Sequence, residues 1–194
     1  EGVAPLPPEW AAYVRKHNRL AELTARVIDA ARRSRTPVGV ENPADRGDEL
    51  TGAAWDEKAD YASIWRMPCV RDALQRCGAF PVTFAQCGRV RHPNGELLPL
   101  GSAAQKWTTV AASPWLAKEL EPLADALCEH GEGGHDHRLE GRGPDGVPRA
   151  TAAAAYPRGL AAFLAGALER AARAQRAVRE AEWAAQPEAP QRSE

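Results

Sequence analysis

Soft metal ligands gather near the middle of the chain. The segment CEHGEGGHDH, residues 128–137, supplies four of them: Cys128, His130, His135 and His137. Thiolate and imidazole are the ligands that Zn²⁺ prefers, a tetrahedral ion needs only four, and glycines let a loop wrap around it. We expect Cys87 to add a further thiolate from a neighbouring strand end. The spacing matches no standard zinc finger, and the alternative is a solvated loop with Cys128 buried at a helix end.

A carboxylate and an amide follow a short apolar run, Val38-Gly39-Val40, which is typical of a buried strand. In open α/β sheets ligands bind beyond the carboxyl ends of strands, so Glu41 and Asn42 are placed to hydrogen-bond a ligand. A carboxyl group desolvated there has a raised pKa and can donate a proton. The alternative is a strand that ends in an ordinary turn, because Asn-Pro is common turn punctuation.

Cationic and aromatic side chains are candidate contacts to nucleic acid. Loops that converge at the sheet edge would bring several cations to phosphates: Arg89, Arg91, Lys106, Arg138, Arg142, Arg149 and Arg158. Four aromatic residues could stack on bases or pack in the core: Trp55, Tyr61, Trp65 and Trp107. Acidic residues are interspersed throughout, so a solvated surface of mixed charge is the alternative.

Helices are predicted where apolar residues recur every three to four positions. The first runs over residues 9–33, with Trp10, Tyr13, Leu20, Leu23, Val27 and Ile28 at helical spacing. A short helix over 69–77 stops at Gly78. Ser113 as the cap and Pro114 at the first position begin a helix that continues to residue 128 with a kink at Pro122. A second long helix covers 156–183.

Strands are predicted at 38–40, 81–86 and 107–111, and Pro93-Asn94-Gly95 signals a turn. The alternation of helices and strands predicts an α/β fold. We expect a partial Rossmann-like, methyltransferase-type three-layer sandwich with long flanking helices. The expected division is an extended segment over 1–8, one domain over 9–171, and a helix extension with a disordered tail over 172–194.

Composition limits the classes of protein. The chain has 194 residues and a net charge of -1, which excludes binding of nucleic acid by bulk charge alone. The sequence has neither an apolar run long enough to span a bilayer nor a signal peptide, so no membrane partner is expected. Four cysteines without a CxxC pair predict reduced thiols and an intracellular location, with the nucleus included. Because the first residue is Glu, we expect a piece of a longer chain or polyprotein.

The strand end at Glu41-Asn42 resembles the Glu-Asn-Val strand end of the DNA cytosine-5 methyltransferases, with Pro43 in the Val position. In that family the Glu contacts and protonates the target cytosine while a Cys attacks the ring. The family next has a helix, a strand and a Gln-x-Arg-x-Arg strand. Residues 69–77, 81–86 and 105–109 follow the same order, and Gln105 matches, but Trp107 and Thr109 replace the arginines.

The resemblance spans residues 6–170. It implies that Glu41 and Asn42 are catalytic, that Gln105 and Lys106 bind the substrate, and that S-adenosylmethionine is the cofactor of the parent protein. The overall layout also resembles uncharacterised proteins from mobile elements of microbial eukaryotes. The matching segments there are Ile64–Pro68, Gln86–Gly88, Lys106–Thr108, Cys128-x-His130 and Ala155–Pro157.

The family's glycine-rich cofactor loop and its Pro-Cys nucleophile loop do not precede Glu41, since residues 3–36 contain no Cys. We therefore expect the C-terminal half of a methyltransferase-like domain of the cytosine-5 type, inactive by itself. The alternative is a non-catalytic, zinc-stabilised module from a mobile element that binds nucleic acid or another partner. A third hypothesis is a degenerate domain that merely folds.

Overall fold

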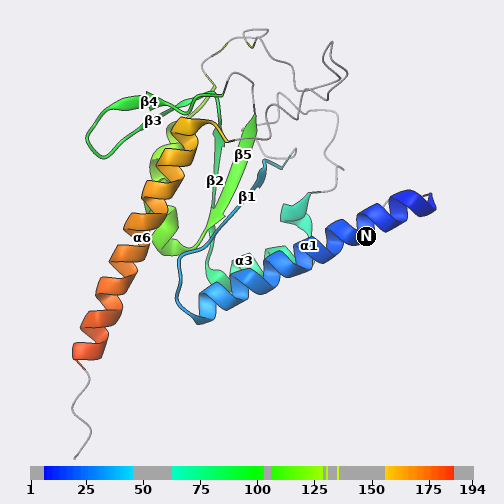
Figure 1. Ribbon diagram of the computed structural model, residues 1–194, viewed down its shortest axis with the longest axis horizontal. Coiled ribbons are helices and arrows are strands. Elements are labelled where there is room, and N and C mark those ends of the chain that lie inside the picture. The colour runs from blue at the N-terminus through cyan, green and yellow to red at the C-terminus, as the bar shows by residue number, and fades with distance from the viewer. Residues whose placement is uncertain are drawn as a thin grey trace, which may run out of the picture.

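The computed structural model describes residues 7–45, 63–102, 106–128, 130, 135 and 156–185. The fold is mixed α/β. A small sheet separates two groups of helices, α1 and α3 on one face and α4 and α6 on the other (Figure 1). Within the described ranges, no helix combines the length and hydrophobicity that a membrane span requires.

The central sheet contains β1 (Gly39–Pro43), β2 (Phe80–Ala85) and β5 (Trp107–Ala112), in the order β1-β5-β2. The middle strand β5 is antiparallel to both neighbours, so β1 and β2 run in the same direction without touching. The expectation of a Rossmann-like fold implied a parallel sheet, and the described strands do not form one. Strands β1 and β2 are linked by way of α3 and run in the same direction. The chain then returns along β5, which lies between them and runs the opposite way, so the small sheet is antiparallel.

Helix α1 (Pro8–Arg33) and helix α3 (Pro68–Cys77) cover the first face of the sheet. Their shared core is formed by Ala25, Ile28 and Ala73, with Val40 of β1 packed against it. A two-pronged ion pair between Arg76 and Asp29 joins the helices, at 2.7 Å and 3.2 Å. Helix α3 ends at Gly78 in the left-handed conformation, as the sequence predicts.

The second face carries α4 (Pro114–Leu120), the 3-10 helix η3 (Glu121–Asp125) and α6 (Arg158–Ala184). This side holds the larger hydrophobic core. Its buried residues come from the sheet and from these three helices: Phe84, Val110, Leu116, Leu120, Leu123, Leu160, Phe163 and Ala167. The predicted kink at Pro122 takes the form of a change from α-helix to 3-10 helix, because proline cannot donate the next backbone hydrogen bond.

A short hairpin of β3 (Arg89–Arg91) and β4 (Leu97–Pro99) connects β2 to β5. Its turn lies at the predicted Pro-Asn-Gly signal, where Gly95 adopts a positive φ of 87°. The hairpin packs on the start of α6. A Cβ at Gly159 would lie 2.4 Å from the carbonyl oxygen of Pro99, so only glycine allows this approach.

The structure corrects several local expectations. Glu41 and Asn42 lie within β1 rather than beyond its end. The side chain of Ser113 does not cap α4 and instead accepts a hydrogen bond from the backbone N–H of Val38 at 3.1 Å. The short helix η2 (Ile64–Arg66) fastens Trp65 beside β1, where its indole donates to the Pro43 carbonyl at 2.9 Å. Trp65 therefore braces a strand end.

Candidate metal centre

Two cysteines from distant parts of the chain meet at one end of the sheet. Cys87 follows β2 in the tight turn that leads into β3, and Cys128 follows η3. The Ala85 N–H donates to the Ala126 carbonyl at 2.8 Å, which fixes the end of η3 beside the end of β2. The backbone at Gly88 lies so close to this segment that a Cβ there would be 2.7 Å from the Ala126 carbonyl carbon. Backbone packing therefore sets the separation of the two thiols.

Two histidines complete the cluster. His135 Nε2 lies 3.0 Å from the Cys128 sulfur and 3.8 Å from the Cys87 sulfur. His130 Nδ1 lies 3.8 Å from the Cys128 sulfur. All four ligand atoms lie within 4.8 Å of one another, and the two imidazole rings have centroids 4.4 Å apart. These four side chains could hold a metal ion.

The spacing of the ligand atoms is close to that around a tetrahedral ion of small radius. Zn–S bonds of about 2.3 Å and Zn–N bonds of about 2.0 Å at tetrahedral angles put ligand atoms roughly 3.3–3.8 Å apart. Three sulfur-to-nitrogen distances at the cluster are 3.0 Å, 3.8 Å and 3.8 Å, and every pair of ligand atoms lies within 4.8 Å. Four of the five metal ligands predicted from the sequence are thus brought together. The fifth, His137, lies outside the described residues.

Burial makes ionisation of the first thiol difficult. Burial, followed by the neighbouring Cys128 thiol, raises the pKa of Cys87 to about 12. Both Cys87 and Cys128 are partly buried and neither forms a disulfide. A divalent cation held between the two sulfurs would supply the opposite charge that thiolates require at neutral pH.

The residues predicted to be catalytic or to bind the substrate do not all lie on the same face of the sheet. Glu41 pairs with Val110 and so projects to the α6 face of the sheet, whereas Asn42 pairs with Thr109 and projects to the opposite face. Gln105 lies outside the described residues. Lys106 stands at the start of β5, with its Nζ 5.9 Å from the ring centroid of Tyr156.

Tyr156 joins Glu41 and Lys106 into a second cluster. Burial, followed by the neighbouring Glu41 carboxylate, raises the pKa of Tyr156. The Oε1 atom of Glu41 is buried, and among the described residues it has no hydrogen-bond partner. The sequence marks Tyr156 only as the start of a predicted helix and as part of the Ala155–Pro157 segment of a resemblance. Tyr156 is far from β1 in the sequence, and the path of the chain into α6 brings it near Glu41.

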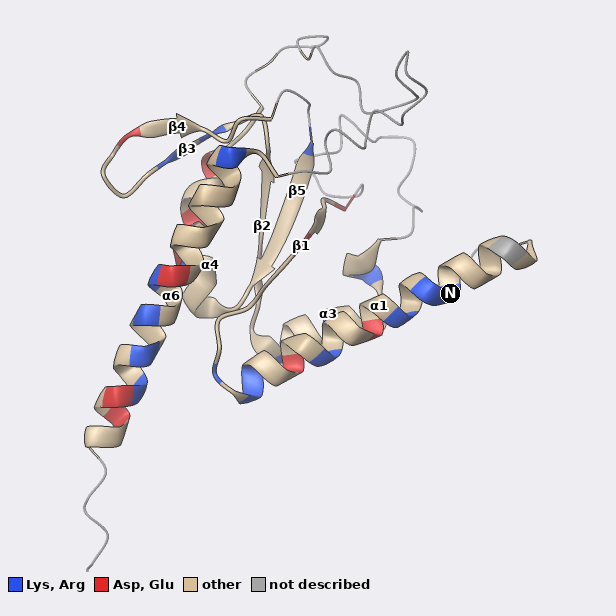
Figure 2. Ribbon diagram, in the orientation of Figure 1, with Lys and Arg blue, Asp and Glu red and all other residues tan. Residues whose placement is uncertain are grey.

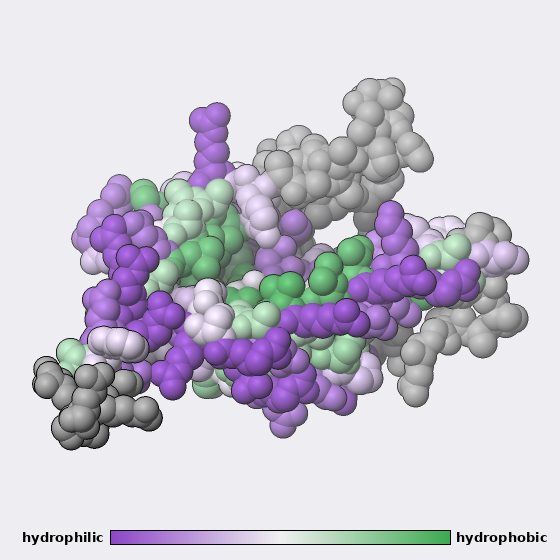
Figure 3. Space-filling model, turned by 60° about the horizontal axis from the view of Figure 1, so that its bottom comes forward, coloured by the Kyte–Doolittle hydropathy of each residue, from purple (hydrophilic) through white to green (hydrophobic). Residues whose placement is uncertain are grey.

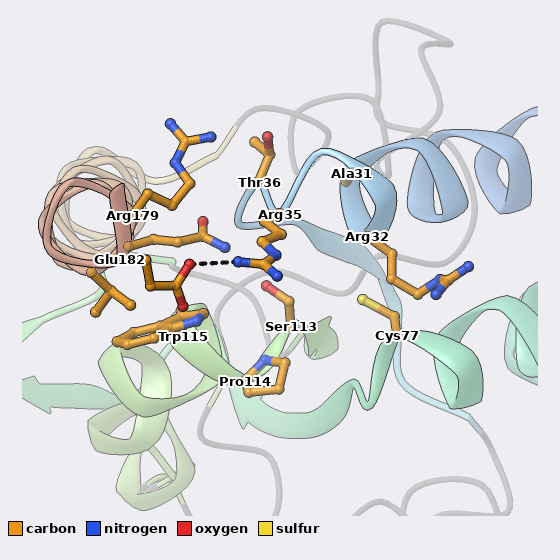
Figure 4. A pocket seen from close by; sticks show the side chains of 12 residues that line it. Ala31, Arg32, Arg35, Thr36, Cys77, Ser113, Pro114, Trp115, Arg179 and Glu182 are labelled. Atoms are coloured by element: carbon orange, nitrogen blue, oxygen red, sulfur yellow. Dashed lines mark hydrogen bonds and ion pairs between the residues drawn. The ribbon is translucent and has the colours of Figure 1, made fainter. Parts of the chain in front are cut away.

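A shallow cleft of about 310 Å³ lies at the other end of the sheet, beyond the end of β5 (Figure 4). Arg35 bridges it by an ion pair with Glu182 at 2.7 Å. Trp115 lines its floor, and Arg32 and Arg179 stand at its rim with their side chains turned outward. The principal cation of the cleft is thus already neutralised, and no Cys–His cluster adjoins it among the described residues.

We compared the chain with protein-family models, with curated proteins and with solved structures, and none of the three comparisons found a match.

Proposed function

We propose that this chain is a non-catalytic, zinc-stabilised module that binds nucleic acid. The observation that carries the proposal is the convergence of Cys87, Cys128, His130 and His135, whose ligand atoms lie within 4.8 Å of one another. Two thiols and two imidazoles form a donor set that suits Zn²⁺ better than the hard cations Mg²⁺ and Ca²⁺, which take oxygen ligands.

The geometry favours a structural role for the metal. Four protein ligands fill a tetrahedral zinc, whereas catalytic sites keep one position open for water or substrate. The ion would tie the turn after β2 to the segment after η3, at one end of a sheet that has three strands among the described residues. Metal binding is then part of the free energy of folding, and removal of the metal lowers stability.

The direct test is metal analysis combined with thermal unfolding. Purified protein should contain about one zinc per chain, and a strong chelator should lower its Tm reversibly. The variant Cys128→Ser should lose the zinc, and Cys69→Ser should retain it. Cys69 is a matched control because it is partly buried in α3, packed on the other face of the sheet. Zinc-free protein with an unaltered Tm in chelator would refute the proposal.

Cations on three elements support nucleic acid as the partner. Arg89 and Arg91 are exposed on β3, Arg158 is exposed at the start of α6, and Lys106 directly precedes β5. Figure 2 shows these basic segments around the end of the sheet where β2 leads into β3. Binding through a few phosphate contacts should weaken steeply with salt, and Arg89→Ala with Arg91→Ala should reduce the slope by about 2. Binding that ignores salt and both substitutions would exclude this partner.

A second candidate function rests on the cluster around Glu41. We infer that the chain is the C-terminal part of a Rossmann-like, cytosine-5 methyltransferase-type domain that uses S-adenosylmethionine in a longer protein. The cluster supports this candidate because a buried carboxylate oxygen without a partner among the described residues is suited to contact a base. Two strands that run the same way, β1 and β2, linked through α3, are compatible with it.

The test of this candidate uses the longer protein and labelled S-adenosylmethionine. Glu41→Gln should abolish methyl transfer to DNA, because the amide cannot donate a proton as the acid does. Glu96→Gln, on the exposed β3–β4 hairpin, is the matched control and should leave transfer intact. Equal activity of the Glu41→Gln protein and the wild type would exclude a catalytic role for Glu41.

A further inference from the structure

Helix α1 has an apolar face that the rest of the described chain leaves uncovered. Five of its large side chains are at least half exposed: Trp10 57%, Tyr13 56%, Leu20 50%, Leu23 55% and Val27 53%. Figure 3 shows hydrophobic side chains gathered in a row along this side of the molecule, bordered by a hydrophilic band. The helix buries a different stripe against α3, namely Ala21, Ala25 and Ile28.

The uncovered residues have the spacing of a coiled-coil seam. Alternating steps of three and four residues define two rows of positions, with Trp10, His17 and Thr24 in the first row and Tyr13, Leu20 and Val27 in the second. This is the a/d repeat, which keeps one side of a helix turned toward a partner helix. Leu23, at a g position, widens the seam. The rings of Tyr13 and His17 already contact each other at a tilt of 49°, with ring centroids 4.2 Å apart.

We propose that α1 pairs with α1 of a second copy of this chain, which forms a homodimer. The charge pattern supports this occupant. The seam and its flanks carry one charged residue between positions 13 and 28, Lys16, so an apolar and nearly uncharged partner surface fits it. A second copy of the same seam has that surface. The other charged side chains of this stretch fall at the c and f positions: Arg15, Arg19, Glu22 and Arg26.

The available area is sufficient for a dimer. With roughly 200 Å² for a large side chain, the exposed fractions of the five apolar residues leave about 500 Å² per protomer. Two such faces together reach the ~1,000 Å² that a specific interface requires. Helix α3 covers the neighbouring stripe of Ala21, Ala25 and Ile28, which leaves the seam itself open to a partner.

The experiment is a mass measurement by light scattering on the purified, zinc-loaded chain over a wide concentration range. The wild type should approach twice the chain mass of 20.9 kDa. The double variant Leu20→Glu, Leu23→Glu should weaken association at least ~100-fold, because it places four carboxylates in the seam. Leu168→Glu is the matched control, since Leu168 is 45% exposed on α6, and it should remain dimeric.

A cross-linking experiment keeps the proposal testable if the double variant does not fold. Leu20 lies near the middle of α1, so parallel and antiparallel pairing both bring the two copies of residue 20 together. Leu20→Cys should therefore form a reducible dimer under mild oxidation, and Leu168→Cys should not. A wild type that stays monomeric at every concentration, or equal cross-linking of both cysteine variants, would overturn the proposal and leave α1 to a different partner.

Discussion

The substitution Gly88→Ala should disable the metal centre without touching a ligand. Gly88 follows Cys87, and its backbone lies against the segment that ends in Cys128. An added Cβ would be 2.7 Å from the carbonyl carbon of Ala126 and 2.8 Å from the carbonyl oxygens of Ala126 and Leu127. All three are backbone atoms, so no side chain can swing away to make room.

The magnitude follows from these distances. Carbon atoms in contact are ordinarily separated by ~3.5 Å or more, so the two segments must part by about 0.8 Å. Zinc ligands tolerate displacements of only about 0.2 Å. Overpacking of this kind costs about 1–3 kcal/mol. If that cost falls on the metal centre, zinc affinity drops by roughly 10-fold to 100-fold.

The assay is competition for zinc between the protein and a coloured chelator of known affinity. The matched control is Gly166→Ala on α6, where the nearest atom is the flexible end of Arg170 at 3.1 Å. That change should stabilise the helix by up to ~1 kcal/mol and leave zinc affinity unaltered. Unchanged zinc affinity in the Gly88→Ala protein would refute the reasoning from backbone contact.

Three further changes probe single interactions of the fold. Thr108→Val removes the acceptor of a buried hydrogen bond from the Gln86 amide at 2.9 Å, and should lower the free energy of unfolding in urea by about 1–3 kcal/mol; an unchanged value would mean that the amide finds another partner. Arg76→Ala should raise the pKa of Asp29, which that guanidinium now lowers, as an NMR titration would show. The Asp29–Arg76 contribution is present above the unfolded-state pKa of Asp29 and is lost as pH falls through the lower folded value, so Arg76→Ala and wild type should converge in stability in acid. Because the pKa of Tyr156 is raised, its contribution is complete below its ordinary pKa of about 10 and fades as pH rises, so Tyr156→Phe should flatten the alkaline loss of stability.

The sequence predicted the helix ends and turns that depend only on residues close together in the chain. Gly78 ends α3, and Pro114 begins α4. The turn at Gly95 and the buried face of Leu116 and Leu120 also follow from local signals. These features involve residues a few positions apart, where backbone preferences and periodicity act directly.

The sequence could not predict features that depend on contacts between segments far apart in the chain. Periodicity identified α1 as amphipathic but could not tell which of two adjacent apolar stripes is buried, so Leu20 and Ile28 looked alike although only Ile28 is covered. The direction of β5 follows from its return path rather than from its composition. The approach of Tyr156 to Glu41 arises in the same way, because it joins segments more than a hundred residues apart.

The Cys–His cluster was predictable for a chemical reason. Cys128, His130 and His135 are close in sequence, and thiolate and imidazole are ligand types that Zn²⁺ prefers. Cys87 was added only as the nearest strand-end thiol, and the contact of the turn after β2 with the end of η3 brings it there. Metal binding at this cluster, and zinc as the metal, are predictions that the zinc measurements test.

The place of β5 at the centre of the sheet has a consequence for the order of folding. Neither β1 nor β2 can complete its hydrogen bonds until β5 is available, since each pairs with β5 alone among the described strands. During synthesis from the N-terminus, residues 39–85 must therefore wait, with unpaired strand edges, until residue 112 leaves the ribosome. Such late, long-range pairing makes folding slow and exposes the nascent chain to aggregation.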